Sequence, residues 1–356
     1  MARTPSAGPT ITSVAERAGV SKATVSKVVN GRPGMSAATR VRVERVIREL
    51  GYVPTRRSPP VRPRSLTAVF DTLVSVYSLR VLDGMVAAAQ IAGIDLATRV
   101  LSPGASPGGR SGAAVDLDAV AGGTVLDRAF VEEVAERGHV GMIVVTTVID
   151  ADVVDASLDA GITIVAVDSP NPLDRSVASI GSNHSTGGRQ AAEHLIGLGH
   201  RRIGFVGGDP ANPGLRARFG GYRDALLAAG IPDDPALVSE EGMGTAGAAV
   251  QRFLTLPDRP TAVFATNDAD AFAVVRAVVD AGLRVPEDVS VVGYDDTYSA
   301  MQTVPRLTTV HTSMHDIGRA AVETLLRIHA GERPFSHHLE LATTLVERES
   351  TAPPGR

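Results

Sequence analysis

The chain contains no cysteine among its 356 residues. This absence excludes disulfide bonds, thiol catalysis and cysteine-based zinc sites together. No apolar run approaches the roughly 18 residues that a membrane span needs, and the N-terminus lacks the apolar segment of a secretory signal. We therefore expect a protein of the cytoplasm with no membrane partner. Hydrophobic residues make up 44% of the chain, enough for the cores of one small and one large domain.

Acidic residues are scarce in the N-terminal segment. Residues 1–64 hold 13 of the 35 Lys and Arg residues and three acidic ones, so this segment carries about +10 in a chain with a formal net charge of −4. Lysine is almost absent, and the only two, Lys22 and Lys27, both lie in this segment. A basic segment in an otherwise acidic protein favours a polyanion as partner and confines nucleic-acid contact to this end of the chain.

The start of the chain has the pattern of two short helices joined by a tight turn. Thr10 or Thr12 can cap the first helix, and Gly19 can end it by adopting a positive φ. Ser21 can cap the second helix, which is expected over residues 22–29. Small and apolar side chains on the first helix allow the two helices to pack closely. A helix-turn-helix requires this packing to hold its second helix in the major groove.

A third helix is expected from Ser36 to Leu50, and the three helices together predict an all-α headpiece over residues 1–54. An ordinary three-helix bundle with a basic surface is the alternative, and it would require the turn glycine, the caps and the apolar spacing to coincide by accident. The apolar side chains expected in the core are Val14, Ala15, Ala18, Val20, Val25, Val28, Val29, Val41, Val43, Val46, Ile47 and Leu50.

The segment from Thr10 to Pro54 contains the motifs Val14-Ala15, Ala18-Gly19-Val20-Ser21, Thr24-Val25-Ser26, Asn30-Gly31, Val46 and Leu50-Gly51-Tyr52. These motifs closely resemble the headpiece of the LacI/GalR family of bacterial repressors, and the resemblance continues through almost the whole chain. It implies a homodimer that binds double-stranded operator DNA. By this resemblance, the residues that read bases are Lys22, Ala23 and Lys27. Those that contact phosphates are Thr12, Ser21, Thr24 and Asn30.

Residues 55–65 form a basic, proline-rich linker. Members of the family usually have a hinge helix here that inserts a leucine into the minor groove. Pro60 would lie inside that helix and cost about 3 kcal/mol, and Val61 stands at the leucine position. We expect instead an extended linker that contacts phosphates or the minor groove, with a flexible spacer as the alternative. The side chains concerned are Arg56, Arg57, Val61, Arg62 and Arg64.

From residue 66 the chain alternates strand-like apolar runs with helical stretches, which predicts βα units and parallel sheets. Strands are expected at residues 66–70, 95–101, 141–146, 162–167, 203–206, 262–265 and 289–292. Helices are expected at residues 78–92, 185–198, 216–229, 268–281 and 316–329. The resemblance implies a two-lobed, doubly wound α/β domain like the periplasmic binding proteins, for effector binding and dimerisation, over residues 66–356. The first lobe is expected at about 66–180 and 312–341, and the second at about 181–311 and 342–356.

Polar residues follow several of the expected strands, where ligands of open α/β sheets bind. They are Asp71, Asp168, Asn267, Asp268, Asp295 and Asp296. Carried over residue by residue, the effector contacts of the family fall on Asp168, Arg218, Asn267 and Asp295, and more loosely on Tyr77 and Thr312. Guanidinium, amide and carboxylate groups suit paired hydrogen bonds with hydroxyls, so the expected effector is a sugar or oligosaccharide. The aspartates could instead cap turns, Arg218 could form a structural ion pair, and Tyr77 could merely pack.

Two other classes of protein compete with a regulator. A periplasmic sugar-binding protein would share the large domain but would need a signal peptide, and a sugar-acting enzyme would need catalytic groups. Gly207-Gly208 lacks the spacing of a phosphate loop, and the pairs His311/His315 and His337/His338 lack a third ligand placed by a motif. We predict a repressor associated with the nucleoid, with no enzyme activity, no cofactor and no metal.

Overall fold

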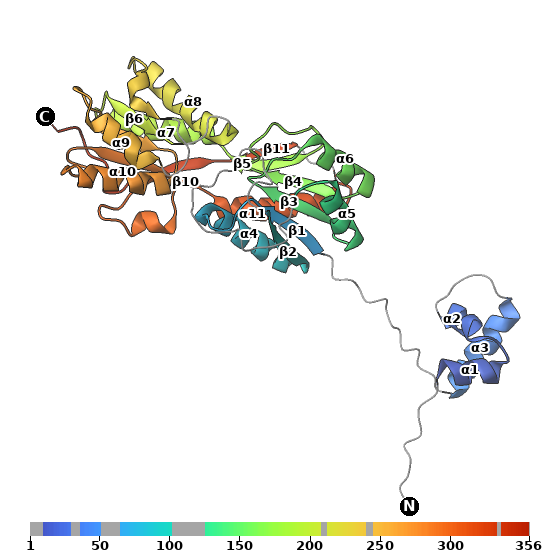
Figure 1. Cartoon of the computed structure of the whole chain (residues 1–356). Coiled ribbons are helices and arrows are strands. Elements are labelled where there is room, and N and C mark those ends of the chain that lie inside the picture. The colour runs from blue at the N-terminus through green and yellow to red at the C-terminus, as the bar shows by residue number, and fades with distance from the viewer. Residues whose placement is uncertain are drawn as a thin grey trace, which may run out of the picture. The chain divides into compact units, whose positions relative to one another are not determined.

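The structure is a computed structural model that describes residues 10–29, 36–50, 65–101, 125–207, 212–239, 245–332 and 336–355. The chain forms two compact units, residues 1–62 and 63–356. In the smaller unit, the described residues form α1 (Ile11–Ala18), α2 (Lys22–Val29) and α3 (Ala37–Leu50) (Figure 1). The predicted linker contacts Arg56, Arg57, Val61, Arg62 and Arg64 lie outside the described residues, as does Asn30.

The first two helices begin and end at capping residues. Thr10, and not Thr12, caps α1: its hydroxyl accepts a hydrogen bond from the Ser13 amide at 3.3 Å, and the Ser13 hydroxyl accepts one from the Thr10 amide at 2.8 Å. Gly19 ends α1 with φ at +64°, a conformation that glycine adopts without a steric penalty. Ser21 caps α2. The turn between these helices is therefore fixed by local chemistry.

Among the described side chains, which do not include Val29, the core of the headpiece follows the predicted apolar pattern with one exception. Its buried side chains include Val14, Ala15, Ala18, Val25, Val28, Val43 and Val46, with Val20, Ile47 and Leu50 packed at the margin. Val41 was expected in this core but is 62% exposed. The apolar stripe of α3 runs through positions 43, 46, 47 and 50, and residue 41 falls off that stripe.

The larger unit contains two sheets. The first has the strand order β11-β5-β4-β3-β1-β2 and is parallel throughout. Its strands are β1 (Ser65–Phe70), β2 (Asp95–Val100), β3 (Gly141–Val145), β4 (Thr163–Val167), β5 (Ala178–Ser182) and β11 (His338–Leu341). The second has the order β12-β10-β9-β8-β6-β7, and β12 alone in it pairs antiparallel. Its strands are β6 (Ile203–Val206), β7 (Val238–Ser239), β8 (Ala262–Ala265), β9 (Ser290–Asp295), β10 (Thr308–Thr312) and β12 (Thr343–Val346).

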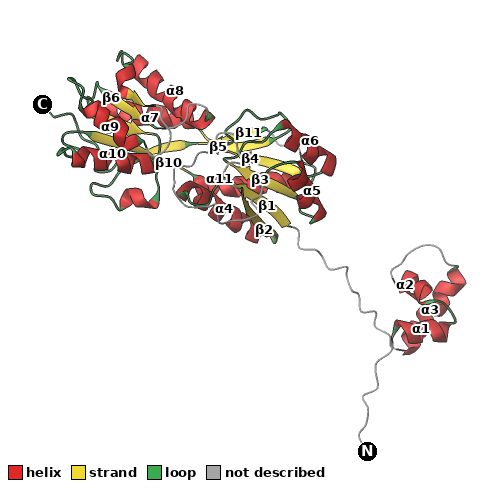
Figure 2. Cartoon of the chain, viewed as in Figure 1, coloured by secondary structure: helices red, strands yellow, loops and turns green. Residues whose placement is uncertain are grey.

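Helices cover both faces of each sheet, so each lobe is a three-layer α/β unit (Figure 2). On the first sheet, α4 (Val76–Ala92) and α11 (Met314–His329) pack on one face, and α5 (Arg128–Glu136) and α6 (Ala151–Ala160) on the other. On the second sheet, α7 (His184–Gly197) and α8 (Pro213–Ala228) pack opposite α9 (Ala246–Leu254) and α10 (Asp268–Asp280). The 3-10 helices η1 (Pro235–Leu237) and η2 (Tyr298–Met301) lie in the second lobe.

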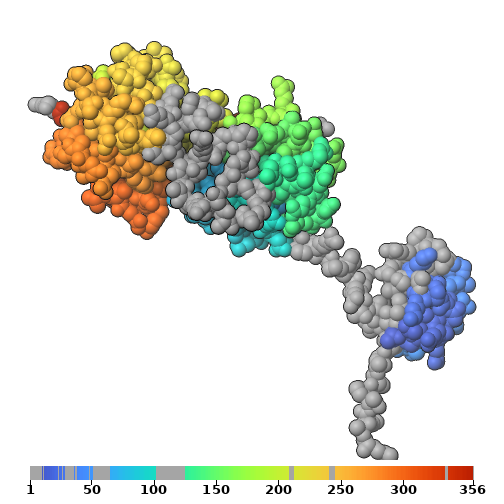
Figure 3. Space-filling view, viewed as in Figure 1, coloured from blue at the N-terminus to red at the C-terminus, as the bar shows by residue number. Residues whose placement is uncertain are grey.

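The chain passes between the lobes after β5, after β10, and between β11 and β12. Each lobe is thus built from segments that are far apart in the sequence. Figure 3 shows the lobes as two bodies, one cyan to green and the other yellow to orange. The α/β fold class predicted from the alternating pattern is confirmed, with parallel pairing in both sheets apart from β12.

Several elements were not anticipated from the sequence, among them β5, β10, α5, α6 and α9. Strand β5 reads Ala-Ser-Ile-Gly-Ser and β10 reads Thr-Thr-Val-His-Thr, so neither has the continuous apolar run of a buried parallel strand. None of the helices in the described part of the chain combines the length and apolar character needed to span a bilayer.

Candidate ligand-binding site

Two aspartates lie at the carboxyl ends of strands, one in each lobe. Asp168 directly follows β4 with φ at +43°, and Asp295 ends β9 with φ at +104°. Residues other than glycine rarely adopt positive φ, and such strain persists where the surrounding structure holds it, often at functional sites. The side chains of Asp168 and Asp295 are 15% and 13% exposed. Both therefore present nearly buried carboxylates at the edge of the sheets where α/β proteins bind ligands.

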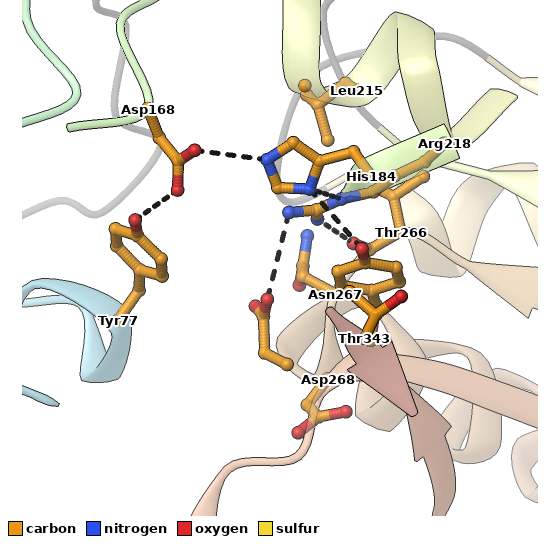
Figure 4. Close-up of polar contacts among 12 residues, drawn as sticks. Tyr77, Asp168, His184, Leu215, Arg218, Thr266, Asn267, Asp268 and Thr343 are labelled. Carbon is orange, nitrogen blue, oxygen red and sulfur yellow. Dashed lines mark hydrogen bonds and ion pairs between the residues drawn. The ribbon is translucent and has the colours of Figure 1, made fainter. Parts of the chain in front are cut away.

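Asp168 accepts hydrogen bonds on both of its carboxylate oxygens. Tyr77 Oη, from α4 in the same lobe, donates to Oδ2, and His184 Nε2, at the start of α7 in the other lobe, lies 3.3 Å from Oδ1 (Figure 4). Burial alone would raise the pKa of Asp168, but its contacts with His184 and Tyr77 and the charge of Arg218 outweigh burial and hold the pKa below its ordinary value. Asp168 is therefore an ionised acceptor at neutral pH.

Arg218, on α8, is a buried cation at the centre of the second lobe's side of the site. Its side chain is 10% exposed, and the guanidinium lies 3.8 Å from the ring centroid of Tyr294. Nη1 donates to the Thr266 carbonyl at 2.5 Å, and Nη2 lies 3.9 Å from Asp295 Oδ1. Nε donates to His184 Nδ1 at 3.3 Å. The arginine thus joins β8, β9 and α7, as Figure 4 shows.

Asp295 is the least satisfied charge in the site. Burial raises its pKa to about 7, although Arg218 works in the opposite direction, and the neighbouring Asp268 and Asp168 raise it further. Its Oδ1 is buried and accepts no hydrogen bond within the described residues. The carboxyl group therefore needs either a proton or a donor from outside the protein.

Three hydroxyls share this condition. Among the described residues, the buried side-chain oxygens of Ser182, Thr266 and Thr312 also form no hydrogen bond. These residues end or follow strands of both sheets, β5 in the first and β8 and β10 in the second. Buried polar atoms are almost always paired, so unpaired ones at the carboxyl ends of strands favour a place for a polar molecule. The arrangement suits a ligand rich in hydroxyl groups, which can both donate and accept.

Other strand-end residues proposed from the sequence do not point into this site. Asp268, whose pKa burial raises to about 6, accepts from the Thr297 amide and the Thr309 hydroxyl, both at 2.6 Å. Asp71 accepts from Thr146 Oγ1 at 2.8 Å on an exposed surface. Their places after strands suggested ligand contacts, but Asp71 and Asp268 instead hold loops of their own lobe.

The side chains of Asn267 and Asp296 form hydrogen bonds within the second lobe, and Asn267 lies beside Arg218 in the site (Figure 4). Asn267 caps α10: its Oδ1 accepts from the Asp270 amide at 2.8 Å and its Nδ2 donates to the Asp270 carboxylate at 2.7 Å. Asp296 pairs with Arg348 at 2.5 Å and with His311 at 3.0 Å. Within the described residues, no group of three or more His, Asp or Glu side chains could hold a metal ion.

Sequence reasoning missed His184 and Tyr294. His184 follows β5, a strand that the sequence did not reveal, so its place at a strand end was hidden. Tyr294 immediately precedes Asp295 in β9, and the Arg218 guanidinium stacks over its buried ring. A signal was present for Tyr294 alone, since it adjoins the end of a strand that the sequence predicted.

The candidate DNA-binding side chains lie on and around α2. Lys22 and Lys27 are exposed, and Ala23 lies between them in the helix. The hydroxyls of Ser21 and Thr24 are 2.9 Å apart. Two exposed lysines on the second helix of a helix-turn-helix can reach base edges, and the short hydroxyls can reach phosphates.

Comparisons with known proteins cover nearly the whole chain. Residues 10–55 match the model described as "Bacterial regulatory proteins, lacI family", and residues 192–351 match a periplasmic binding protein-like domain. The HTH-type transcriptional regulator CelR of Thermobifida fusca is 35% identical over 96% of this chain and 98% of its own length. The lactose operon repressor of Escherichia coli is 31% identical over 97% of this chain and 91% of its own length.

Solved structures agree with these relatives. A complex described as transcriptional regulator CelR with cellobiose has a TM-score of 0.66 and 32% identity, over 96% of this chain and 99% of that one. The lac repressor dimer bound to operator and the anti-inducer ONPF has a TM-score of 0.68 and 26% identity, over 97% of this chain and 100% of that one.

Proposed function

The chain belongs to the lacI family of bacterial regulatory proteins, and we propose that it is a repressor whose affinity for operator DNA is controlled by a sugar bound between its lobes. The main support for a sugar is the buried, unpaired oxygen of Asp295 beside the Arg218 guanidinium. Together with the unpaired hydroxyls at the ends of β5, β8 and β10, these groups offer a ligand an ionisable acceptor, a cation and hydroxyls. The residues proposed to contact the effector are Tyr77, Asp168, Arg218, Asn267, Asp295 and Thr312.

The headpiece supplies the DNA-binding half of this function. We propose that Lys22, Ala23 and Lys27 read base edges, because a lysine can donate to guanine O6 and N7 and an alanine offers apolar contact to a thymine methyl. The proposed phosphate contacts are Thr12, Ser21, Thr24 and Asn30. Base contacts set the sequence preference, whereas phosphate contacts set the register of the helix on DNA.

A homodimer fits the apolar surface of the larger unit. On α4, Val76 and Leu79 are 42% and 49% exposed, and in the second lobe Tyr298 and Val304 are 68% and 95% exposed. Each lobe thus exposes large apolar side chains that a protein partner could cover. A second copy of the chain would cover these surfaces and bring two headpieces to pseudo-palindromic half-sites.

We propose no catalytic activity for this protein. CelR and the lactose operon repressor carry the names of regulators and not of enzymes. In this chain both oxygens of Asp168 accept hydrogen bonds from protein donors, so Asp168 and Asp295 are not a free pair of carboxylates for acid and base roles. We propose that the protein acts on the chromosome in the cytoplasm.

DNA selection tests the proposed function directly. The full-length protein is used to enrich binding sequences from random duplexes, and its affinity for the enriched site is then measured with cellobiose, lactose, ribose and glucose. We expect a pseudo-palindromic site and at least a tenfold change in affinity with one sugar, about 1.4 kcal/mol of coupling. A periplasmic-type sugar-binding protein or an enzyme would enrich no sequence.

A further inference from the structure

His184 stands where the chain first passes from one lobe to the other. β5 of the first lobe ends at Ser182, and α7 of the second lobe begins at His184, so a single residue, Asn183, separates them. The His184 side chain is 11% exposed and contacts groups of both lobes. A rigid contact at this position determines the angle that the crossing segment can adopt.

The hydrogen bonds of His184 define the position of its proton. Arg218 Nε carries a hydrogen and can only donate, so His184 Nδ1, 3.3 Å away, must be an acceptor. The proton of the neutral imidazole is then on Nε2, which donates to Asp168 Oδ1 at 3.3 Å. Tyr294 Oη, also 3.3 Å from Nδ1, can donate to the same lone pair. The imidazole thus links Asp168 of the first lobe to Arg218 of the second.

Glycines on both sides make room for this link. A Cβ at Gly181, in β5, would lie 2.3 Å from Asp168 Oδ1, the oxygen that His184 reaches. A Cβ at Gly187, in α7, would lie 2.5 Å from the Tyr294 hydroxyl. Side chains at either position would displace the groups that His184 contacts. The groups facing the imidazole are Asp168 and, through it, Tyr77 from the first lobe, and Arg218, Tyr294 and Asp295 from the second.

The two halves of the site therefore differ in what they offer a ligand. On the second lobe, Asp295 Oδ1 and the Thr266 and Thr312 hydroxyls are unpaired among the described residues. On the first lobe, the Ser182 hydroxyl is also unpaired, but each oxygen of the Asp168 carboxylate already accepts one hydrogen bond, Oδ2 from Tyr77 of its own lobe and Oδ1 from His184. Each carboxylate oxygen has two lone pairs, so a ligand hydroxyl that donates to Oδ1 either shares this oxygen with His184 Nε2 or displaces it.

We propose that His184 is a positioning residue: its link between Asp168 and Arg218, here called the brace, holds the segment that first crosses between the lobes. We further propose that the effector changes the angle between the lobes by competing with His184 for Asp168. This competition rests on the proposed function, whereas the brace does not. Donation of an effector hydroxyl to Asp168 frees the imidazole and with it the crossing segment. An interaction at one site is thereby converted into a change of angle between two rigid bodies.

The brace is tested by measuring the distance between the lobes without sugar or DNA. The chain has no cysteine, so Leu158→Cys in α6 and Leu227→Cys in α8, which are 63% and 78% exposed, give the full-length protein one labelling site per lobe. Distances between spin labels are recorded for the otherwise unchanged chain, for His184→Ala and for His184→Gln. The two single-cysteine proteins identify distances between protomers.

We expect His184→Ala to shift the distance between lobes by about 2 Å or more, or to broaden its distribution. His184→Gln should keep the original distance, because its amide can donate to Asp168 from nearly the same place. His194→Ala is the matched control: this histidine is on the same helix, is 9% exposed and contacts Thr351, not Asp168. Circular dichroism melts verify that the variants are folded.

An unchanged distance in His184→Ala, or the same shift in His194→Ala, would overturn the brace. If His184→Ala does not fold, Asp168→Ala removes the same bond from the first lobe and must give the shift. Because no sugar or DNA is present, failure here leaves the proposed function intact. Conversely, failure of the DNA selection would overturn the proposed function without affecting the brace.

Discussion

Gly188 in α7 lies so close to Arg218 in α8 that a Cβ at Gly188 would be 2.1 Å from the Arg218 carbonyl oxygen. A glycine of α8 is equally close to α7, since a Cβ at Gly221 would be 2.0 Å from the Ser185 carbonyl oxygen. The two helices therefore meet backbone to backbone. This contact fixes the start of α7, which carries His184, against the turn of α8 that carries Arg218.

Substitution Gly188→Ala should disturb the ligand site as well as stability. The added methyl group meets backbone, which cannot rotate away, so the helices must separate, at a cost of about 1 to 3 kcal/mol. Gly197→Ala, in the last turn of the same helix, is the control, because a Cβ there meets nothing within 4 Å. Urea denaturation should show a loss for the first variant and no loss for the second, and equal stabilities would contradict the backbone contact.

Arg218→Ala should abolish the response to sugar and leave operator binding intact. The substitution removes a cation from above the Tyr294 ring and leaves Asp295 without its neighbouring positive charge. Arg216→Ala, an exposed arginine on the same helix, should retain the response. Operator binding with and without the sugar identified by selection is the measurement. Retention of the full sugar effect by Arg218→Ala would remove this residue from the site.

Asp295→Asn should change how stability depends on pH. Burial raises the pKa of Asp295 to about 7 from an ordinary value of 3.8, so the folded state binds this proton more tightly than the unfolded state. Its contribution to the free energy of unfolding therefore falls as pH rises from about 4 to 7, and is constant above that range.

Relative to the wild type, Asp295→Asn should thus gain about 1 to 2 kcal/mol between pH 5.5 and pH 8, at roughly 1.4 kcal/mol per pH unit below the folded pKa. Denaturation at both pH values measures this difference. Burial lowers the pKa of His200 and gives an opposite slope, but that slope is common to both proteins and cancels. Parallel curves for the two proteins would mean that Asp295 keeps an ordinary pKa.

Lys27→Ala should relax the preference for one base pair in each half-site by about 1 kcal/mol or more. The lysine is exposed on α2, where it can donate to a base edge. Thr24→Ala, at a proposed phosphate contact on the same helix, provides the comparison, since loss of a phosphate contact weakens binding to all sequences alike. Affinities for operators substituted at each position separate the two effects. A uniform loss in Lys27→Ala would identify a phosphate contact.

The parts of the fold that the sequence predicted are those with strong local signals. The headpiece helices carry caps and a turn glycine, and β3, which reads Gly-Met-Ile-Val-Val, is apolar throughout. β5 and β10 were missed because their burial comes from helices packed on them by other parts of the chain, and hydroxyl-bearing residues such as Thr308 and Thr309 are buried with them. Tertiary contact, not local composition, makes these segments strands.

The sequence predicted which charged residues belong to the site, but not which hydrogen bonds they form. Asp168, Arg218 and Asp295 could be placed by strand ends and by resemblance to a family, and the structure brings them to one edge. Nothing in the sequence indicates that Asn267 uses its amide to cap α10 or that His184 reaches Asp168. Such pairings depend on helix orientations of a fraction of a turn, which periodicity does not determine.

The interleaving of the lobes has a consequence during synthesis of the protein. The first sheet lacks α11 on one face and β11 at its edge until the ribosome has passed Leu341, although β1 emerged more than two hundred residues earlier. The three helices described in the headpiece, by contrast, are complete by residue 50. A message cut short before Leu341 therefore yields a finished DNA-binding module attached to two incomplete lobes. Such a product could occupy operators without any means of being released by an effector.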